Sequence, residues 1–388
     1  MSVPGWLRQR IEASGGAVPF RTYMEWVLHD PEHGAYGSGR LQIGPAGDFA
    51  TAPSLGPEFA GLLAPQLASW LAELAAPLPA GERLALLEAG PGEGALAADL
   101  AAALAAGWPE LAARTELVLV EPNAGMAARQ RQRLAGCPLP CRWSSFADLA
   151  AAPVRGVLLA HEVLDALAVE RIVWDGALWR RQQVALHGEA AAGPSLRLEP
   201  GESLSPALEL LPAFAERPPG WTTELHPGLE PWLAAAAAAL AAGPLLVIDY
   251  ALEAWRYYAP QRSAGTLMAY RAQGASADPL LDPGSADLTA HLCIESLMAA
   301  AEVSGWQPLG QCRQGEALLA LGLAERLHGL QHRPGAALAT LLGRREALLR
   351  LVDPHALGDF RWLAFNRGQA LATPLFLQTP PAPATGPG

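Results

Sequence analysis

A run of alternating glycines is the feature of this chain best suited to hold a small molecule. Gly90, Gly92 and Gly94 follow the acid Glu88, which ends a short apolar segment. Glycine adopts backbone conformations that other residues avoid, and it lets the main chain approach a ligand closely. Where such a turn opens a helix, the free N–H groups of the first helical turn attract polar or anionic groups. The pattern predicts a ligand-binding turn between a strand and a helix.

A second acid, Glu121, lies at the end of the next apolar segment. A carboxylate in this position can accept hydrogen bonds from both hydroxyls of a nucleoside ribose. NAD and S-adenosylmethionine (SAM) both carry that ribose, and Gly90, Gly92 and Ala95 also satisfy the dinucleotide pattern Gly-x-Gly-x-x-Ala. Three interpretations therefore stay open: a SAM site, an NAD(P) site, or a purely structural turn. The acid before the first glycine, Glu88, favours SAM.

The elements that position these residues follow from four apolar runs, which predict buried strands at residues 83–88, 116–121, 155–161 and 245–250. Helical patterns lie between them, at residues 95–106 and around Arg129. Apolar strands that alternate with helices predict an α/β protein with a parallel sheet covered on both faces. The loop after the third strand carries His161, Glu162 and Asp165, which we expect at the ligand-binding edge of that sheet.

The composition excludes several classes of function. All 27 basic residues of the 388-residue chain are arginines. The absence of lysine excludes a Walker A phosphate loop and a pyridoxal Schiff base. The formal net charge is −11, so we expect no nucleic-acid partner, because such proteins normally present a basic face. With 51% hydrophobic residues, the chain can bury a sizeable core.

Cysteine spacing and apolar runs bear on metal binding and location. Four cysteines do not indicate a disulfide framework, and Cys137 and Cys141 lack a second pair of zinc ligands, so we expect no metal site. Residues 231–248 are uncharged, but Gly243-Pro244 divides them into an alanine-rich helix to about Ala242 and a strand, which argues against membrane insertion. No apolar signal core opens the sequence. These features favour a cytoplasmic protein.

Further motifs extend from residue 19 to residue 368. They are Asp30-Pro-Glu-His-Gly-Ala-Tyr36, Gly47-Asp-Phe-Ala-Thr-Ala-Pro53, Glu88-Ala-Gly-Pro-Gly-Glu-Gly94, Val120-Glu-Pro122, His161-Glu-Val-Leu-Asp-Ala166, Ile248-Asp-Tyr250, Gly265-Thr-Leu-Met-Ala-Tyr270, Asp282-Pro-Gly284, Asp287-Leu-Thr-Ala-His291 and Gly315-Glu-Ala-Leu-Leu-Ala320. In these motifs and their order, the chain resembles the MidA-like family of SAM-dependent protein arginine methyltransferases. Mitochondrial members of that family are assembly factors for respiratory complex I. The sequence departs from the family pattern at His161, Ser54 and Cys293.

The resemblance implies a class I, Rossmann-like methyltransferase core at residues 81–372. It also implies an N-terminal helical or lid segment at 1–80 and a substrate lobe inserted at about 174–230, while the Pro-rich residues 373–388 are expected to be disordered. The implied cofactor is SAM, held by the glycine turn, Glu88 and Glu121. The implied reaction is methyl transfer to an arginine of a protein, with a hydrophilic subunit of a complex I-like NADH dehydrogenase as the expected partner. The sequence leaves the oligomeric state unknown.

The family also suggests roles for individual residues. Asp48, Thr51 and Pro53 are expected in a lid over the cofactor, with His161 beside it. Carboxylates match the fork of a guanidinium, so Glu162, Asp165 and Glu224 are the candidates that orient the acceptor.

Structural and functional alternatives stay open for these residues. Asp165 or Glu224 could cap a helix, and His161 could be structural. The chain could also be a small-molecule N- or O-methyltransferase, a non-catalytic SAM-binding assembly factor, or an NAD(P)-dependent oxidoreductase.

Overall fold

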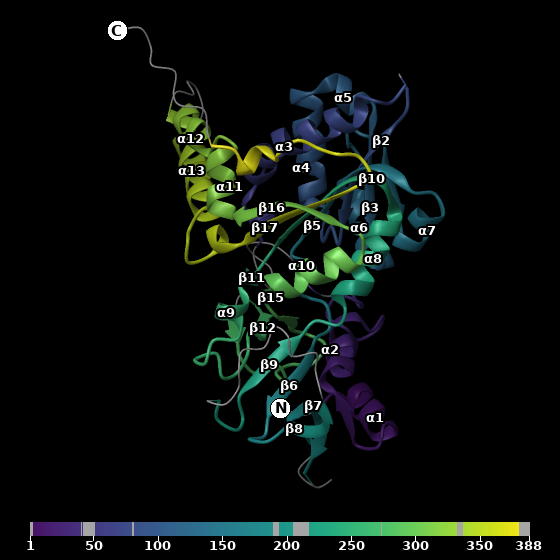
Figure 1. Ribbon diagram of the computed structural model, residues 1–388, viewed down its shortest axis with the longest axis vertical. Coiled ribbons are helices and arrows are strands. Elements are labelled where there is room, and N and C mark those ends of the chain that lie inside the picture. The colour runs from purple at the N-terminus through teal and green to yellow at the C-terminus, as the bar shows by residue number, and fades with distance from the viewer. Residues whose placement is uncertain are drawn as a thin grey trace.

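The computed structural model describes residues 3–39, 41, 51–79, 81–188, 194–204, 217–272, 274–331 and 337–379. Figure 1 shows two parts of the molecule: a large sheet with its covering helices in the upper part, and a lobe of smaller sheets below it. None of the helices within these ranges is long and apolar enough to cross a membrane.

The main sheet has seven strands in the order β16-β17-β10-β5-β2-β3-β4. Their bounds are β2 Leu84–Ala89, β3 Thr115–Val120, β4 Cys141–Ser144, β5 Val154–His161, β10 Leu240–Asp249, β16 Gln307–Arg313 and β17 Arg361–Arg367. The five strands from β4 to β10 are mutually parallel, whereas β17 is antiparallel to both of its neighbours. The four predicted strands and the α/β class are confirmed. The predicted helix to Ala242 is too long, because the strand β10 already begins at Leu240.

Helices cover both faces of this sheet, which explains why its central strands β2, β5 and β10 are mostly apolar and almost entirely buried. In β2, Leu84 and Leu86 face α3 (Glu58–Ala75) and α4 (Ala95–Gly107), whereas Ala85 and Leu87 face the opposite layer. That opposite layer contains α7 (Phe146–Ala151), α8 (Leu229–Ala239) and α10 (Ile294–Val303). Further helices are α5 (Pro109–Ala113), α6 (Ala124–Arg133), α11 (Gln314–Ala320), α12 (Leu323–Gln331) and α13 (Leu338–Leu351).

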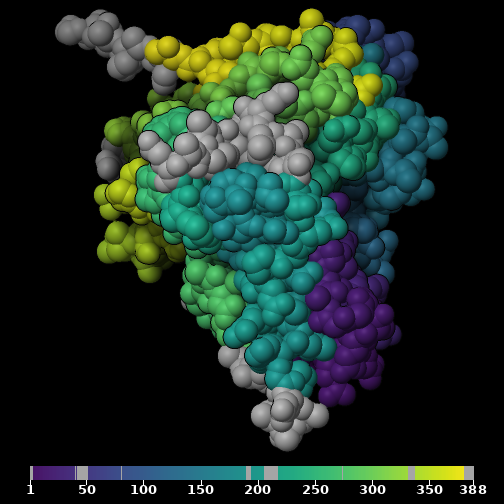
Figure 2. All heavy atoms as spheres, turned by 60° about the horizontal axis from the view of Figure 1, so that its bottom comes forward, coloured from purple at the N-terminus to yellow at the C-terminus, as the bar shows by residue number. Residues whose placement is uncertain are grey.

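The lobe combines three separate segments of the chain. Its antiparallel sheet contains β1 (Ala17–Pro19), β6 (Glu170–Trp174), β7 (Trp179–His187), β8 (Ser195–Leu204) and β9 (Thr222–Leu225). The helices α1 (Gly5–Ala13) and α2 (Phe20–His29) pack against it through a shared core, and Figure 2 shows the purple N-terminal residues lying along the teal strands. Within the expected 1–80 segment, α1 and α2 therefore belong to the lobe, whereas α3 covers the main sheet.

A second insertion, between β10 and α10, completes the lobe. It contains β11 (Ala251–Leu252), α9 (Ala254–Tyr257), β12 (Met268–Arg271), β13 (Gly274–Ser276), β14 (Asp287–Thr289) and β15 (Leu292–Cys293). The strands β13, β12 and β14 form a small antiparallel sheet, and Leu288 of β14 joins the same core as α2. Sequence periodicity did not predict this insertion, because its strands are only two to four residues long.

The first part of the tail that was expected to be disordered is ordered, which corrects that prediction. Residues 375–377 form a 3-10 helix, η4, after the tail has crossed α3. Phe376 is 2% exposed and its ring lies edge-on to Trp70 and Trp362, at centroid distances of 6.2 and 5.4 Å. Aromatic burial of this extent outweighs the entropic cost of ordering a short segment. Residues 380–388 lie outside the described ranges.

Phe376→Ala tests this anchor. We expect it to lower the free energy of unfolding by about 3 kcal/mol, because a buried aromatic ring leaves a cavity between two tryptophans. Urea denaturation measures the change, and the exposed Thr373→Ala is the matched control, expected within about 0.5 kcal/mol of wild type. Equal stabilities of the two variants would show that the segment does not pack as described.

Candidate functional site

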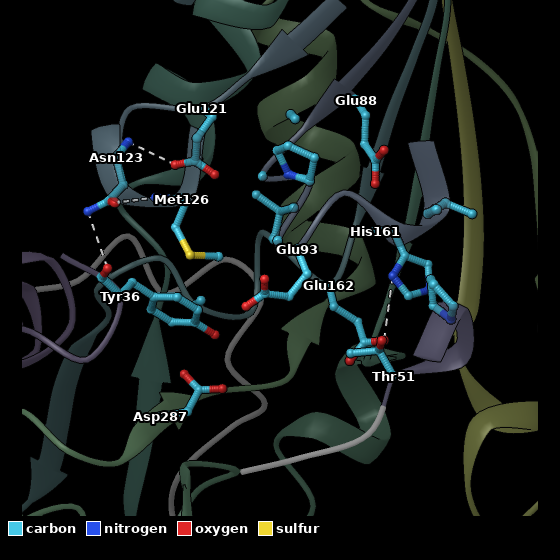
Figure 3. Close-up of a pocket in the computed structure, with 18 of the residues that line it drawn as sticks. Tyr36, Thr51, Glu88, Glu93, Glu121, Asn123, Met126, His161, Glu162 and Asp287 are labelled. Carbon is cyan, nitrogen blue, oxygen red and sulfur yellow. Dashed lines mark hydrogen bonds and ion pairs between the residues drawn. The ribbon is translucent and has the colours of Figure 1, made fainter. Parts of the chain in front are cut away.

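A cavity of about 1700 Å³ lies at the carboxyl edge of the main sheet. Its lining includes the glycine turn, the end of β3, the loop after β5 and residues of the lobe sheet β12–β14. Figure 3 shows Glu121 and Asn123 on one side of this space and His161 and Glu162 on the other. Ligands of open parallel sheets bind at this edge, so the cavity is the candidate functional site.

The glycine turn joins β2 to α4, as predicted. Gly90, Gly92 and Gly94 all have positive φ, at 58°, 51° and 75°. A Cβ built on Gly90 would lie 2.9 Å from Cγ2 of Val163, so a side chain would meet the loop after β5. Gly94 immediately precedes α4, so the turn delivers backbone to the cavity at a helix start.

Glu88 lies below this turn, at the end of β2, and is 4% exposed. The N–H of Ala97 hydrogen-bonds its carboxyl group, but Oε2 is buried without a partner. Burial raises the pKa of Glu88 to about 8, because a carboxylate loses its hydration there. Glu88 lines the cavity, so we expect this oxygen to accept a hydrogen bond from a ligand bound there.

Glu121 directly follows β3 and is held by two neighbours. The backbone N–H of Asn123 donates to its Oε1 at 2.8 Å, and the side-chain amide of Gln130 donates to its Oε2 at 3.0 Å. Burial raises the pKa of Glu121, while these two hydrogen bonds and the charge of Arg129 act in the opposite direction. The Asn123 amide also donates to the backbone oxygens of Tyr36, at 3.3 Å, and Gly37, so the segment after α2 is fixed to this edge.

The loop after β5 is shaped by Asp249, at the end of the neighbouring strand β10. Oδ2 of Asp249 accepts three successive backbone N–H groups, from residues 163, 164 and 165, at 3.3, 3.0 and 3.3 Å. Glu162, directly before them, has a φ of 52°, a strained conformation for a residue with a side chain. The hydrogen bonds hold the backbone in this turn, and both Glu162 and Asp165 line the cavity.

Three carboxyl groups that line the cavity interact electrostatically here: Glu162, Asp165 and Asp287 of β14. The pKa values of Glu162 and Asp165 are raised well above their ordinary range, first by burial and then by the charges of Asp249 and Asp287. Tyr36 hydrogen-bonds Asp287. Within the described residues, no arginine forms an ion pair with Glu162 or Asp165, so this corner of the cavity is suited to a cation.

His161 contacts Glu162 but does not neutralise it. Its Nδ1 lies 3.5 Å from Oε1 of Glu162, and its ring packs edge-on against Phe59. Burial lowers the pKa of His161 to about 3, so the imidazole is neutral near pH 7. Nε2 is buried without a partner in the described structure.

The structure brings most of the predicted site residues together. Glu88, Gly90, Gly92, Glu121, Thr51, Pro53, His161, Glu162 and Asp165 all line the cavity. Gly94 follows the turn and precedes α4. Asp48 lies outside the described residues.

The prediction that Glu224 orients the acceptor is wrong, because this residue lies away from the cavity. It is completely buried within the lobe, where its carboxylate lies 3.4 Å from Nε of Arg171 and accepts the N–H and hydroxyl of Thr266 at 2.9 and 3.2 Å. Glu224 therefore joins β9 to the second insertion and does not line the cavity.

Sequence reasoning missed three residues of the site. Asn123 follows Glu121 by two positions and caps α6, which was a readable signal. Asp287 stands in one of the motifs that carried the family resemblance, but only the fold brings it beside Glu162. Gln130 had no signal, since a glutamine in the middle of a polar helix is unremarkable.

The topology, the glycine turn and the acid after β3 together define a class I methyltransferase fold. The chain matches the family described as "Putative S-adenosyl-L-methionine-dependent methyltransferase" over residues 62–312. It is also similar to a Burkholderia thailandensis protein whose crystal structure contains S-adenosyl-homocysteine, with 31% identity, a TM-score of 0.83, and 98% of this chain and 99% of that one covered. The chain belongs to this family, and its cofactor is SAM. These findings confirm the predicted fold and cofactor and decide against NAD(P).

Two curated relatives carry more specific names. One is the mitochondrial protein arginine methyltransferase NDUFAF7 homolog of Drosophila melanogaster, 27% identical over 93% of this chain and 84% of that protein. The other is the mitochondrial protein arginine methyltransferase NDUFAF7 of Mus musculus, 27% identical over 92% and 83%. The similarity spans nearly the whole chain, as the sequence motifs predicted.

The residues present fit SAM. The turn offers backbone without side-chain obstruction, and Glu121 offers free lone pairs to ribose hydroxyls. Glu88 lines the cavity with one oxygen that has no partner, and we expect that oxygen to accept from an amino group. Thr51 and Pro53 line the opposite wall. We therefore expect these residues to hold the cofactor.

Glu121→Ala tests the ribose position. Loss of a charged acceptor should weaken binding of S-adenosylhomocysteine by at least about tenfold, measured by titration calorimetry. The exposed Glu110→Ala is the control and should bind like wild type. Unchanged affinity of the Glu121 variant would place the ribose elsewhere.

Glu88 should also make stability depend on pH. Its pKa is raised from 4.5 to about 8, so between these values the native state holds a proton that the unfolded chain has lost. The free energy of unfolding therefore falls as pH rises through this window, by on the order of a few kcal/mol. Glu88→Gln removes this contribution, so its stability relative to wild type should increase from pH 5 to pH 8 in urea titrations. The exposed Glu82→Gln should show a constant difference, and a constant difference for Glu88→Gln would contradict the assignment.

Proposed function

We propose that this chain transfers a methyl group from SAM to the guanidinium of an arginine in a protein. The observation that carries the proposal is the group of carboxyls formed by Glu162, Asp165 and Asp287 beside the cofactor cavity. The names of the two curated relatives support the same acceptor. A peptide arginine is cationic, planar and long enough to enter a cavity from a protein surface.

Bound SAM supplies an electrophilic methyl group on a positively charged sulfur. The role of the protein is to hold the acceptor nitrogen in line with that methyl and to exclude water. Glu162 and Asp165 offer acceptor oxygens from one loop, which match the parallel N–H groups of a guanidinium and fix its plane. Asp287, held by Tyr36, adds a third acceptor from the opposite wall.

The electrostatics of the carboxyl cluster favour a cation over a neutral acceptor. The pKa values of Glu162 and Asp165 are raised first by burial and then by the charges of neighbouring carboxyls, and an entering guanidinium favours the ionised form against both effects. Each methyl transfer also releases one proton from the acceptor nitrogen. A carboxylate with a raised pKa, such as Glu162, is suited to accept it.

Partner and location remain predictions. A hydrophilic subunit of a complex I-like NADH dehydrogenase is the expected substrate by family resemblance alone. The curated relatives are named as mitochondrial proteins, and the cytoplasmic location that we expect for this chain is inferred from its sequence only.

Glu162→Gln tests the proposed function. The substitution keeps the size of the side chain but replaces one acceptor oxygen with a donor that opposes the guanidinium. We expect kcat/KM for an arginine-containing peptide to fall by about 100-fold, while the Kd for S-adenosylhomocysteine stays within about threefold. The exposed Glu230→Gln in α8 is the control. Full activity of the Glu162 variant on arginine would refute the role of this cluster.

A further inference from the structure

Gln130 lies in α6, outside the lining of the cavity, and is completely buried. All of its side-chain hydrogen-bonding groups are used. Nε2 donates to the carbonyl oxygen of Gly92 at 2.8 Å and to Oε2 of Glu121 at 3.0 Å, and Oε1 accepts the indole N–H of Trp143 at 2.9 Å. One amide thus joins the glycine turn, the end of β3 and the strand β4.

The orientation of this amide is fixed by its partners. The indole N–H of Trp143 can only donate, so Oε1 must face it. The carbonyl of Gly92 and an ionised Glu121 can only accept, so the NH₂ group must face them. A hydrophobic side chain of equal size would leave both acceptors unpaired, and a glutamate would place negative charge against them. Among the standard side chains of this length, glutamine is the one that satisfies all three partners.

The contacts also control the carboxylate of Glu121. Gln130 holds Oε2 from one side while the N–H of Asn123 holds Oε1, so the plane of the carboxylate is set by the protein. The remaining lone pairs of both oxygens are left for donors in the cavity. A hydrogen bond donated to the ionised form also opposes the effect of burial on the pKa of Glu121.

The same amide fixes the distance between two parts of the cofactor site. Gly92 belongs to the turn that presents its main chain to the cavity, and Glu121 is the residue to which we assign the hydrogen bonds from the ribose hydroxyls. Gln130 also packs against Gly94, because a Cβ built there would lie 3.4 Å from its Cγ. The turn and the ribose acceptor are consequently tied to each other by one side chain, in addition to the strands that carry them.

We propose that Gln130 is a positioning residue that sets the ribose selectivity of the cofactor site, acting through Glu121. It touches no ligand itself. Its contribution to affinity should therefore depend on the ribose hydroxyls and on Glu121, and should disappear when either is removed. The inference rests on the assignment of Glu121 and is independent of the arginine acceptor.

The test compares two ligands, S-adenosylhomocysteine and its 2′,3′-dideoxy analogue, by titration calorimetry. Gln130→Met keeps the volume and removes the three hydrogen bonds. We expect it to weaken S-adenosylhomocysteine by at least about tenfold and the analogue by less than about threefold. Gln130→Glu should weaken S-adenosylhomocysteine further, because its carboxylate repels Glu121. Gln132→Met, the same substitution at an exposed position of α6, is the matched control and should leave both affinities unchanged.

A double-mutant cycle separates positioning from a merely structural role. In a Glu121→Gln background, Gln130→Met should have less than about a threefold further effect on S-adenosylhomocysteine. Trp143→Phe removes the N–H that anchors the amide oxygen, together with part of the ring that Arg131 stacks on. It is a milder variant should Gln130→Met fail to fold, and its loss of affinity should again be confined to the ribose-bearing ligand. Equal weakening of both ligands, or full additivity in the cycle, would overturn the proposal. Wild-type affinity of Glu121→Gln would overturn it together with the ribose assignment, without bearing on the arginine acceptor.

Discussion

The architecture of the site depends on the hydrogen bonds that the carboxylate of Asp249 accepts from the loop after β5. Asp249 lies at the end of β10, beside β5, in a parallel register that pairs Ile248 with His161. By accepting three successive N–H groups from the loop after β5, it holds Glu162 at positive φ and presents that loop to the cavity. Burial raises the pKa of Asp249 to about 7, while the backbone hydrogen bonds act against this shift. Asp249 is thus buried at a cost in hydration where it shapes the loop that carries Glu162 and Asp165.

The cavity has two chemically distinct sides. On one side, backbone of the glycine turn and the well-partnered Glu121 suit a nucleoside with a polar amino-acid end. On the other side, Glu162 and Asp165 have no arginine partner in the described chain. Their pKa values are raised by burial and then by the charges of Asp249 and Asp287. Buried groups that are this difficult to ionise are more often functional than stabilising. The segment after α2 joins the two sides, because Tyr36 meets Asn123 through its backbone and Asp287 through its side chain.

Local sequence patterns predicted the strands and the glycine turn, because these depend on the residues of one short segment. The central strands β2, β5 and β10 are mostly apolar because both faces are covered, and the glycines of the turn lie where positive φ is required. Such patterns could not predict contacts between segments that are distant in the sequence. Glu224 had the polarity of a site residue, but Arg171 comes from another strand of the lobe and binds it. Asp287 is brought near Glu162 by the second insertion, whose strands are too short to show a period. Phe376 is held by Trp70 and Trp362, which come from two distant elements.

The central claim is that the carboxyl cluster selects a guanidinium as the methyl acceptor. The most direct measurement offers the protein deuteromethyl-labelled SAM and a synthetic peptide library with arginine, lysine, glutamine or histidine at a fixed central position. Tandem mass spectrometry then locates the labelled atom. The account predicts label on the guanidinium nitrogens of arginine, with no label on lysine. Label on another side chain, with arginine peptides left unmodified, would contradict it.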